Sequence, residues 1–247
     1  MTPTGITAIV VSKGMEGMLR FCLESLHRSL NGVDGTHHVI VVDNATHPPY
    51  HEGFCRHLGV DILRFDLPAA FARASNTAAA LKPNDHYLLL NNDVLLAEAS
   101  LACMLRLLSD APTMGICGSR LIFPDGTIQH CGVVFGPGKI GPYHCFRKRP
   151  ADQAPRTNRE FQAVTGACLL VRRQVWEEMG GLDEAYPFGL EDIDFCLRSR
   201  QQGWRVMCCN ETESLHFEAS TPGRVALDIP SRKLFMEKWN GLYTIDG

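Results

Sequence analysis

The feature that most constrains the fold is the regular alternation of apolar, strand-like runs with amphipathic segments over residues 1–110. Residues 6–12 (ITAIVVS) are almost continuously apolar, which is typical of a strand buried on both faces. Over residues 15–30 apolar side chains recur every three or four positions, which predicts an amphipathic helix ending at Asn31-Gly32. This alternation predicts an α/β fold with a doubly wound, mostly parallel sheet. The other predicted elements here are strands at 37–44, 61–66 and 86–93, and helices at about 70–81 and 97–109.

The second half of the chain does not continue this alternation. Residues 119–135 predict two strands around a Pro-Asp-Gly turn, and residues 136–158, rich in Gly, Pro and basic side chains, predict a loop. No linker of distinct composition separates the halves, so the sequence predicts a single domain, 1–247. The remaining predicted elements are a strand and a short helix within 161–181, a helix at 190–203, a last strand at 205–210 and a C-terminal amphipathic helix at 231–240.

Charge and composition exclude several classes of protein. The formal net charge is -3 and the basic cluster at 147–149 is short, so no nucleic-acid partner is expected. No apolar run reaches the length of a membrane span, and the N-terminus reads as a first strand rather than a signal peptide. The 10 cysteines include no C-x-x-C pair, which indicates reduced thiols and a cytoplasmic protein. Adjacent Cys208 and Cys209, near His216, are poorly spaced for zinc.

Polar side chains follow three of the predicted strands at their carboxyl ends: Ser12 and Lys13, then Asp43 and Asn44, then residues 91–93 (Asn-Asn-Asp). Ligands of doubly wound sheets bind at these ends, so we expect the three groups to converge on one crevice. A carboxylate with neighbouring amide oxygens suits Mg²⁺ or Mn²⁺, whose other ligands are water and phosphate oxygens. The sequence has neither a P-loop nor a G-x-G-x-x-G motif, so a metal is the predicted phosphate-binding group.

Segments along the chain resemble, in the same order, those of family 2 glycosyltransferases with the GT-A fold. The resemblance covers residues 6–220 and is closest to the rhamnosyltransferase-like branch. It implies one GT-A domain, with a nucleotide-binding half of about 1–110 and an acceptor-binding half of about 111–247. The segments that carry it are AIVVS, VIVVDNAT, AAFARASNTAAA, LLLNNDV, TGACLLVRRQVWEEMGGLDEAYPFGLEDIDFCLRSRQQGW and SLHFEAS.

The resemblance assigns the donor side of a site. Asp93 is the expected metal ligand, and His216 would complete the metal shell or hold the diphosphate, although Asp93 could also be a helix N-cap. Asp43 is expected to accept a hydrogen bond from the N3–H of a pyrimidine, although Asp-Asn at a strand end also forms turns. Arg73 is expected to meet the base or a phosphate, unless it is simply a surface side chain. The positions expected to contact the nucleotide sugar are Val11, Ser12, Asp43, Arg73, Asn76, Asn91, Asn92 and Gly166.

Glu191, Asp192 and Asp194 open a predicted helix, where carboxylates also favour the helix dipole. Repulsion among them could raise one pKa toward that of a useful base. Sugar transfer needs such a base, because a hydroxyl is a poor nucleophile until its proton is removed. By its position in the family motif, Asp192 is the expected base, with Glu191 orienting it or binding the acceptor.

The resemblance therefore implies a metal-dependent, inverting glycosyltransferase of cell-surface polysaccharide or glycolipid synthesis. The expected donor is a dTDP- or UDP-sugar, and the expected acceptor a glycan or a lipid-linked glycan. Residues 136–158 or the C-terminal helix could place it at the inner face of the membrane through peripheral contact. Two alternatives remain: an idle GT-A-like binding or scaffold module, because the family often has a carboxylate at Asn91, and a nucleotidyltransferase, which SKGMEG (12–17) matches weakly.

Overall fold

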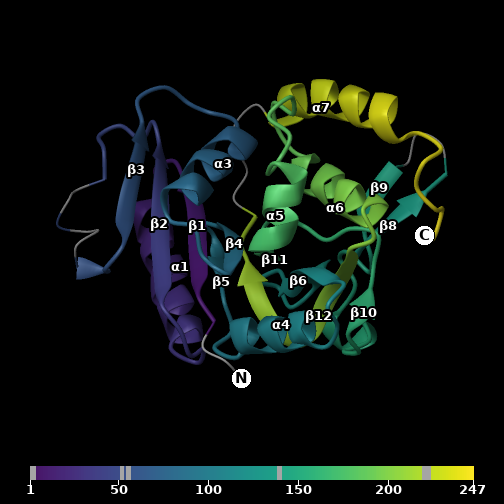
Figure 1. The fold of residues 1–247 in the computed structure, drawn as a ribbon, viewed down its shortest axis with the longest axis horizontal. Helices are drawn as coiled ribbons and strands as arrows, with labels where there is room; N and C mark the ends of the chain where they lie inside the picture. The colour runs from purple at the N-terminus through teal and green to yellow at the C-terminus, as the bar shows by residue number, and fades with distance from the viewer. Residues whose placement is uncertain (1–3, 51–52, 54–56, 138–140, 219–223) are drawn as a thin grey trace.

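A central mixed sheet runs through both halves of the chain, with helices on its two faces (Figure 1). The computed structural model describes residues 4–50, 53, 57–137, 141–218 and 224–247. The strand order in the sheet is β10-β12-β6-β11-β4-β1-β2-β3. Among the described residues, no helix combines the length and apolarity needed to cross a membrane.

The first half forms the parallel part of the sheet, as the alternating pattern predicts. Strand β1 pairs in parallel with both β2 and β4, and β2 pairs in parallel with β3 at one edge of the sheet. The carboxyl ends of these four strands therefore lie on the same side. The elements are β1 (Ile6–Ser12), α1 (Glu16–Leu30), β2 (His37–Asn44), β3 (Asp61–Phe65), α3 (Phe71–Leu81), β4 (His86–Asn91), β5 (Val94–Leu95) and α4 (Ser100–Ser109).

The second half extends the same sheet with strands of both directions. Strand β11 is antiparallel to its neighbours β4 and β6, whereas β12 runs parallel to β6. Strands β8 and β9 form a separate hairpin at the end of the molecule opposite β3 (Figure 1). The elements are β6 (Met114–Ile122), β7 (Ile128–His130), β8 (Val133–Gly136), β9 (Gly141–His144), η2 (Ala151–Gln153), β10 (Arg159–Glu160), β11 (Cys168–Arg172), α5 (Arg173–Met179), α6 (Glu191–Gln201), β12 (Arg205–His216) and α7 (Arg224–Trp239).

Several predicted boundaries are wrong, among them the start of β6, which lies at Met114 rather than at 119. The loop predicted at 136–158 contains β9, which pairs with β8, and the 3-10 helix η2. The last strand continues to His216 beyond a register shift, and there the carboxylate of Glu213 pairs with buried Arg120 at 3.0 Å. Helix α7 begins at Arg224 rather than at 231, and Pro230 lies inside it although proline usually interrupts helices.

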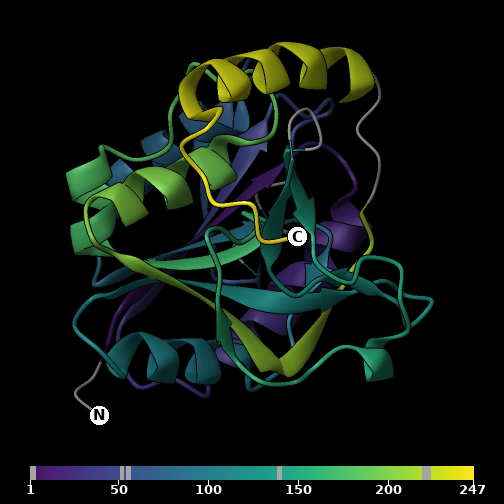
Figure 2. The ribbon, with the colours of Figure 1, turned by 90° about the vertical axis from the view of Figure 1, so that its right-hand side faces the viewer.

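The core has two layers, one on each face of the sheet. Ile9 and Leu89 belong to the layer under α3, α5 and α6, whereas Ala8 and Leu88 belong to the layer under α1 and α4. Figure 2 shows the strands between α4 on one side and α7 on the other. Because both faces are covered, nearly every position of the central strands β1 and β4 is buried, and only Val11 and Asn91 near their carboxyl ends are partly exposed. This is why these strands read as continuous apolar runs.

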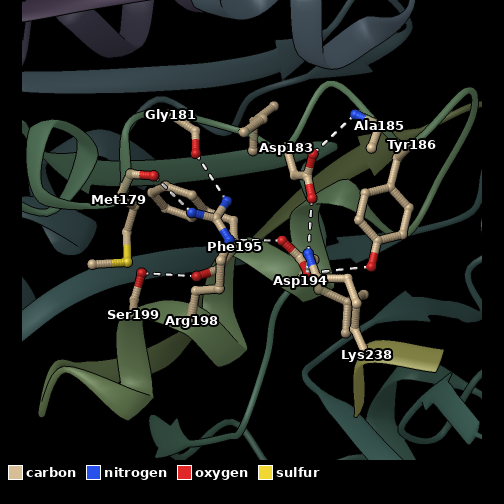
Figure 3. A network of polar contacts seen from close by, with 12 residues as sticks. Met179, Gly181, Asp183, Ala185, Tyr186, Asp194, Phe195, Arg198, Ser199 and Lys238 are labelled. Carbon is tan, nitrogen blue, oxygen red and sulfur yellow. Dashed lines mark hydrogen bonds and ion pairs between the residues drawn. The ribbon is translucent and has the colours of Figure 1, made fainter. Parts of the chain in front are cut away.

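Asp194 of α6 is a buried carboxylate that joins several elements of the second half (Figure 3). Its Oδ2 accepts a hydrogen bond from Arg198 Nε at 2.7 Å, and its Oδ1 lies 2.5 Å from Nζ of Lys238 on α7. The same Oδ1 accepts hydrogen bonds from the Tyr186 hydroxyl and the Trp239 indole. Asp194 therefore serves packing, although it lies with Glu191 and Asp192 in the acidic first turn that the sequence predicts for this helix.

We expect Asp194→Ala to lower the free energy of unfolding by about 2–3 kcal/mol, because it leaves two cations and two buried donors without their acceptor. Urea unfolding of the variant measures this loss. The control is Asp228→Ala, which removes an exposed pair with Arg232 on α7 and should cost under about 1 kcal/mol. Equal losses for the two variants would contradict the joining role of Asp194.

Candidate active site

The short strand β5 brings together the two predicted metal ligands, which are far apart in the sequence. Strand β4 ends at Asn91, and β5 then pairs antiparallel with the end of β12, so that His216 lies opposite Val94. The Phe217 N–H also donates to the carbonyl oxygen of Asp93 at 3.1 Å. As a result, Nε2 of His216 lies 3.2 Å from Oδ1 of Asp93, and both side chains are almost completely buried.

The donor atoms of this pair suit a hard divalent ion. Adjacent ligands of an octahedral Mg²⁺ stand about 3 Å apart, which the Oδ1–Nε2 separation of 3.2 Å matches. The amide nitrogen of Asn91 lies 3.5 Å from the same Nε2, so the Asn91 side chain borders the pair. Within the described ranges, no group of three or more His, Cys, Asp and Glu side chains could hold a metal. An ion at this point would therefore take its other ligands from water and from phosphate oxygens.

A chain of hydrogen bonds holds Asn92 at the end of β1. The Tyr50 hydroxyl donates to the Gly14 carbonyl at 2.5 Å, so it accepts from Ser12 Oγ, which lies 2.6 Å away. Ser12 in turn accepts from the amide of Asn92 at 2.8 Å. Burial raises the pKa of Tyr50, so its phenol stays protonated as this chain requires. The sequence analysis predicted Ser12 and Asn92 but missed Tyr50, because no strand, motif or charge marks its loop.

Asp43 lies beside these residues, but it is enclosed. Its side chain is in register with Ser12 on one neighbouring strand and with Arg64 on the other. Oδ1 accepts the Thr46 N–H at 3.0 Å, and Oδ2 lies 2.5 Å from Nη1 of Arg64. The contact between Asp43 and a base stays a prediction. Arg64 was missed, because its strand pattern (DILRFD) marks it only as a partly exposed position.

Three other residues that the sequence predicts to contact the nucleotide sugar have different surroundings from one another. Val11 is partly exposed near the end of β1 and in register with Asn91, which places it beside the end of β4. Arg73 is exposed on α3. Asn76 instead joins α3 to the segment after α5: its amide donates to the Leu182 carbonyl and accepts the Leu182 N–H, each at 2.9 Å. The structure thus gives Asn76 a packing role, and its contact with a nucleotide stays a prediction.

The turn at 165–167 links Asn91, which borders the predicted metal ligands, to Asp192, the predicted catalytic base. The Asn91 N–H donates to the Ala167 carbonyl at 2.9 Å, and the Gly166 N–H donates to Oδ2 of Asp192 at 2.6 Å. A Cβ at Gly166 would lie 3.0 Å from the Asp192 Cβ. The close approach of Asp192 therefore also favours a small residue at this position, and the contact of Gly166 with the donor sugar stays a prediction. The turn is also tied to β7, because the Thr165 N–H donates to Nε2 of buried His130 at 3.4 Å.

Glu191 and Asp192 have different electrostatic surroundings. Burial and the neighbouring charge of Asp192 raise the pKa of Glu191 to about 8, and its Oε2 has no hydrogen-bond partner among the described residues. Burial also raises the pKa of Asp192, but the N–H groups of Gly166 and Ile193 stabilise its ionised form. Because Asp192 accepts two backbone N–H groups and Oε2 of Glu191 accepts none among the described residues, Glu191 is the member of the pair that keeps its proton to higher pH. In such a pair Asp192 can accept a proton, and protonated Glu191 can donate a hydrogen bond.

The raised pKa of Glu191 makes stability depend on pH. The folded protein binds this proton more tightly than the unfolded chain, so the stabilisation is complete below about pH 4.5 and is lost as pH rises through about 8. Gln stays neutral, so Glu191→Gln should match wild type near pH 4.5 and exceed it progressively toward pH 8, by up to about 1.4 kcal/mol per pH unit. Chemical unfolding at several pH values measures this. The control Glu237→Gln, at an exposed position of α7, should follow wild type.

Comparison with known proteins identifies a family. Residues 3–227 match the family model described as "Glycosyltransferase like family 2". The O-antigen biosynthesis protein RfbC of Myxococcus xanthus is 34% identical over 166 residues, which cover 64% of this chain and 13% of that protein. An N-acetylglucosaminyl-diphospho-decaprenol L-rhamnosyltransferase of Mycobacterium tuberculosis is 29% identical over 154 residues, covering 57% of this chain and 50% of the relative. The chain thus spans at most half the length of these two relatives.

Two solved structures share the fold. GalNAc-T7, crystallised with UDP, GalNAc and Mn²⁺, has a TM-score of 0.67 at 12% identity, over 87% of this chain and 44% of that one. The mannosyltransferase PcManGT of Pyrobaculum calidifontis, in complex with GDP-Man and Mn²⁺, has a TM-score of 0.64 at 16% identity, over 93% and 61%. These similarities confirm the GT-A fold that the sequence predicts.

Proposed function

Because the chain belongs to glycosyltransferase family 2, we propose that it transfers a sugar from a nucleoside-diphosphate donor to a hydroxyl group of an acceptor, with inversion at the anomeric carbon. The observation that carries the proposal is the approach of Asp93 and His216 to 3.2 Å, next to a turn that holds Asp192. Asp93 and His216 suit the binding of a metal that holds the leaving diphosphate. Asp192 suits removal of the proton from the acceptor hydroxyl.

On the donor side, Asp93 and His216 would hold Mg²⁺ or Mn²⁺, with Asn91 at the edge of the pair. The ion would neutralise charge on the leaving diphosphate. Asn92 and Ser12 are held by the hydrogen bonds through Tyr50, so they can contact the ribose without first becoming ordered. The presence of Mn²⁺ and nucleotides in the two solved relatives of the fold supports this assignment.

On the acceptor side, Asp192 would take the proton of the attacking hydroxyl. The hydroxyl oxygen forms its bond to the anomeric carbon as the bond from that carbon to the diphosphate breaks on the opposite face. The proton passes to Asp192, and the nucleoside diphosphate leaves. Neutral Glu191, whose Oε2 is unpaired among the described residues, would donate a hydrogen bond to the acceptor or to the donor sugar.

The Mycobacterium tuberculosis relative supports the substrate class. Its name describes transfer of L-rhamnose to an N-acetylglucosaminyl-diphospho lipid. For this chain we accordingly propose a dTDP- or UDP-linked donor and a lipid-linked glycan or polysaccharide acceptor, used on the cytoplasmic face of the membrane.

A binding assay and a turnover assay on matched variants test the proposal. We expect Mn²⁺ with one nucleoside diphosphate to raise the melting temperature of wild type, and Asp93→Ala to abolish this shift because the metal is lost. Asp192→Asn should keep the shift but lower turnover by about 10²–10⁴-fold, because only the base is removed. The variants should unfold at temperatures close to wild type without ligand.

The products distinguish the alternatives. A glycosyltransferase releases a nucleoside diphosphate from its sugar donor, whereas a nucleotidyltransferase releases pyrophosphate. Binding without either product would favour the idle module. The absence of any nucleotide-dependent shift in wild type would contradict the proposed function as a whole.

A further inference from the structure

We propose that His130 and His144 are positioning residues for Asp192: as a hydrogen-bonded pair they hold the turn at 165–167, and the turn orients the carboxylate of the base. The inference rests on the proposed function, which makes Asp192 the base. It adds two residues that no motif in the sequence singles out. It comes from the contact between the two histidine rings, which lie on β7 and β9, outside the elements that carry the donor and metal residues.

His130 is completely buried at the end of β7, and both nitrogens of its ring have a partner. Nε2 accepts the Thr165 N–H at 3.4 Å, and Nδ1 lies 2.8 Å from Nδ1 of His144 on β9. The two rings meet edge to face, with their centroids 5.0 Å apart. Burial lowers the pKa of His130 well below its ordinary value, so this ring is neutral and carries a single N–H hydrogen.

These contacts fix which nitrogen carries the hydrogen. A backbone N–H can only donate, so Nε2 of His130 has no hydrogen, and the single hydrogen of the neutral ring lies on Nδ1. Nδ1 of His144 must then accept, which places the hydrogen of a neutral His144 on Nε2. The hydrogen between the rings also prevents the two Nδ1 atoms from binding a metal together. The pair therefore presents one oriented acceptor to the turn.

The rest of the fold anchors the pair on both sides. His130 is in register with Leu121 of β6, a strand inside the central sheet. His144 is in register with Val133 in the hairpin of β8 and β9. The Val133 N–H in turn donates to the carbonyl of Ala163, two residues before the turn, at 3.1 Å. The sheet and the hairpin thus hold the two rings, and the rings hold the first residue of the turn.

The turn contacts Asp192 through two of its residues. The Gly166 N–H donates to Oδ2 of Asp192 at 2.6 Å. The Thr165 hydroxyl accepts the Ala167 N–H at 3.3 Å, and its own hydrogen bond to Asp192 opposes the rise in pKa that burial causes there. The other backbone donor to this side chain, Ile193, belongs to α6 itself. Among the described residues, the hydrogen bonds that reach the carboxylate from outside α6 therefore come from the turn.

Loss of the acceptor on His130 would act on the base and leave the metal ligands in place. The Thr165 N–H would be buried without a partner unless the turn moved, and a turn that moves carries its hydrogen bonds away from Asp192. The carboxylate would then lose its orientation, and its pKa would rise because hydrogen bonds to the ionised form keep it low. Asp93 and His216 are brought together by a separate pairing, that of β5 with β12.

Replacements that keep one nitrogen position of a ring test this. The side-chain oxygen of Gln reaches the position of Nε2, and that of Asn reaches the position of Nδ1. His130→Gln therefore keeps an acceptor for the Thr165 N–H, whereas His130→Asn loses it. At the other ring the order is reversed, because His144→Asn keeps the acceptor for His130 and His144→Gln displaces it. A general loss of stability would not give opposite orders at the two positions.

The readout is release of nucleoside diphosphate from dTDP-rhamnose, UDP-glucose and GDP-mannose with Mn²⁺, with water in place of the acceptor. We expect His130→Asn and His144→Gln to lower kcat by about 10–100-fold, and His130→Gln and His144→Asn to stay within about threefold of wild type. KM for the donor should stay within about twofold, because the donor and metal residues are unchanged. The acidic limb of the kcat profile should move to higher pH only in the first two variants, because only they raise the pKa of Asp192.

His86 supplies the matched control. It is a buried histidine at the start of β4, at the opposite end of that strand from Asn91, and its Nδ1 has no partner among the described residues. His86→Asn and His86→Gln should both keep the kcat of wild type. Long-range ¹H–¹⁵N NMR of wild type at pH 8 adds a test that needs no substrate. It should show the ring hydrogen of His130 on Nδ1 and that of His144 on Nε2.

Three results would overturn the inference and leave the proposed function intact. One is equal kcat for His130→Asn and His130→Gln, or the same order of Asn and Gln at both positions. Another is a loss of donor affinity as large as the loss of kcat. The third is the opposite tautomer at His130. If wild type released no nucleoside diphosphate from any of the donors, the proposed function would fail and the inference with it, whatever the tautomers.

Discussion

The pairing of β5 with the end of β12 is the constraint on which the site depends. These short stretches of backbone hydrogen bonding place His216 beside Asp93, although the last polar residues of β12 give little sign of a strand. Without it, Asp93 and His216 would not lie together, and the metal site proposed at the ends of β1 and β4 would lack one of its two ligands.

The structure uses buried carboxylates in two ways. Asp194 and Asp43 have their charges satisfied by cations and N–H donors, and they hold α6, α7 and Arg64 in fixed positions. Glu191 is buried and Asp192 partly buried, neither carboxylate has a cation beside it among the described residues, and burial raises the pKa of each. A group held at this electrostatic cost suits proton transfer. Acidic residues adjacent in one helix thus have separate roles, because the helix turns Asp194 to a different set of neighbours.

The fold could be predicted from the sequence where local periodicity and burial agree. The strands at 6–12 and 37–44 and the helix at 15–30 were predicted to within a residue, because both faces of these strands are covered and the helix has one apolar side. The errors lie where packing overrides the local pattern. Helix α7 continues through Pro230, and β12 continues through a charged stretch whose Glu213 is neutralised by Arg120.

The sequence by itself determined the fold class, the family and the residue types at the strand ends, because those follow from periodicity and from short motifs. Only the tertiary structure decided which of these residues meet. It placed His216 against Asp93, tied Asn76 to Leu182, explained Gly166 by the approach of Asp192 and covered Asp43 with Arg64. Each of these contacts joins elements that lie far apart in the chain. Their distances depend on strand order and register, which no local pattern contains.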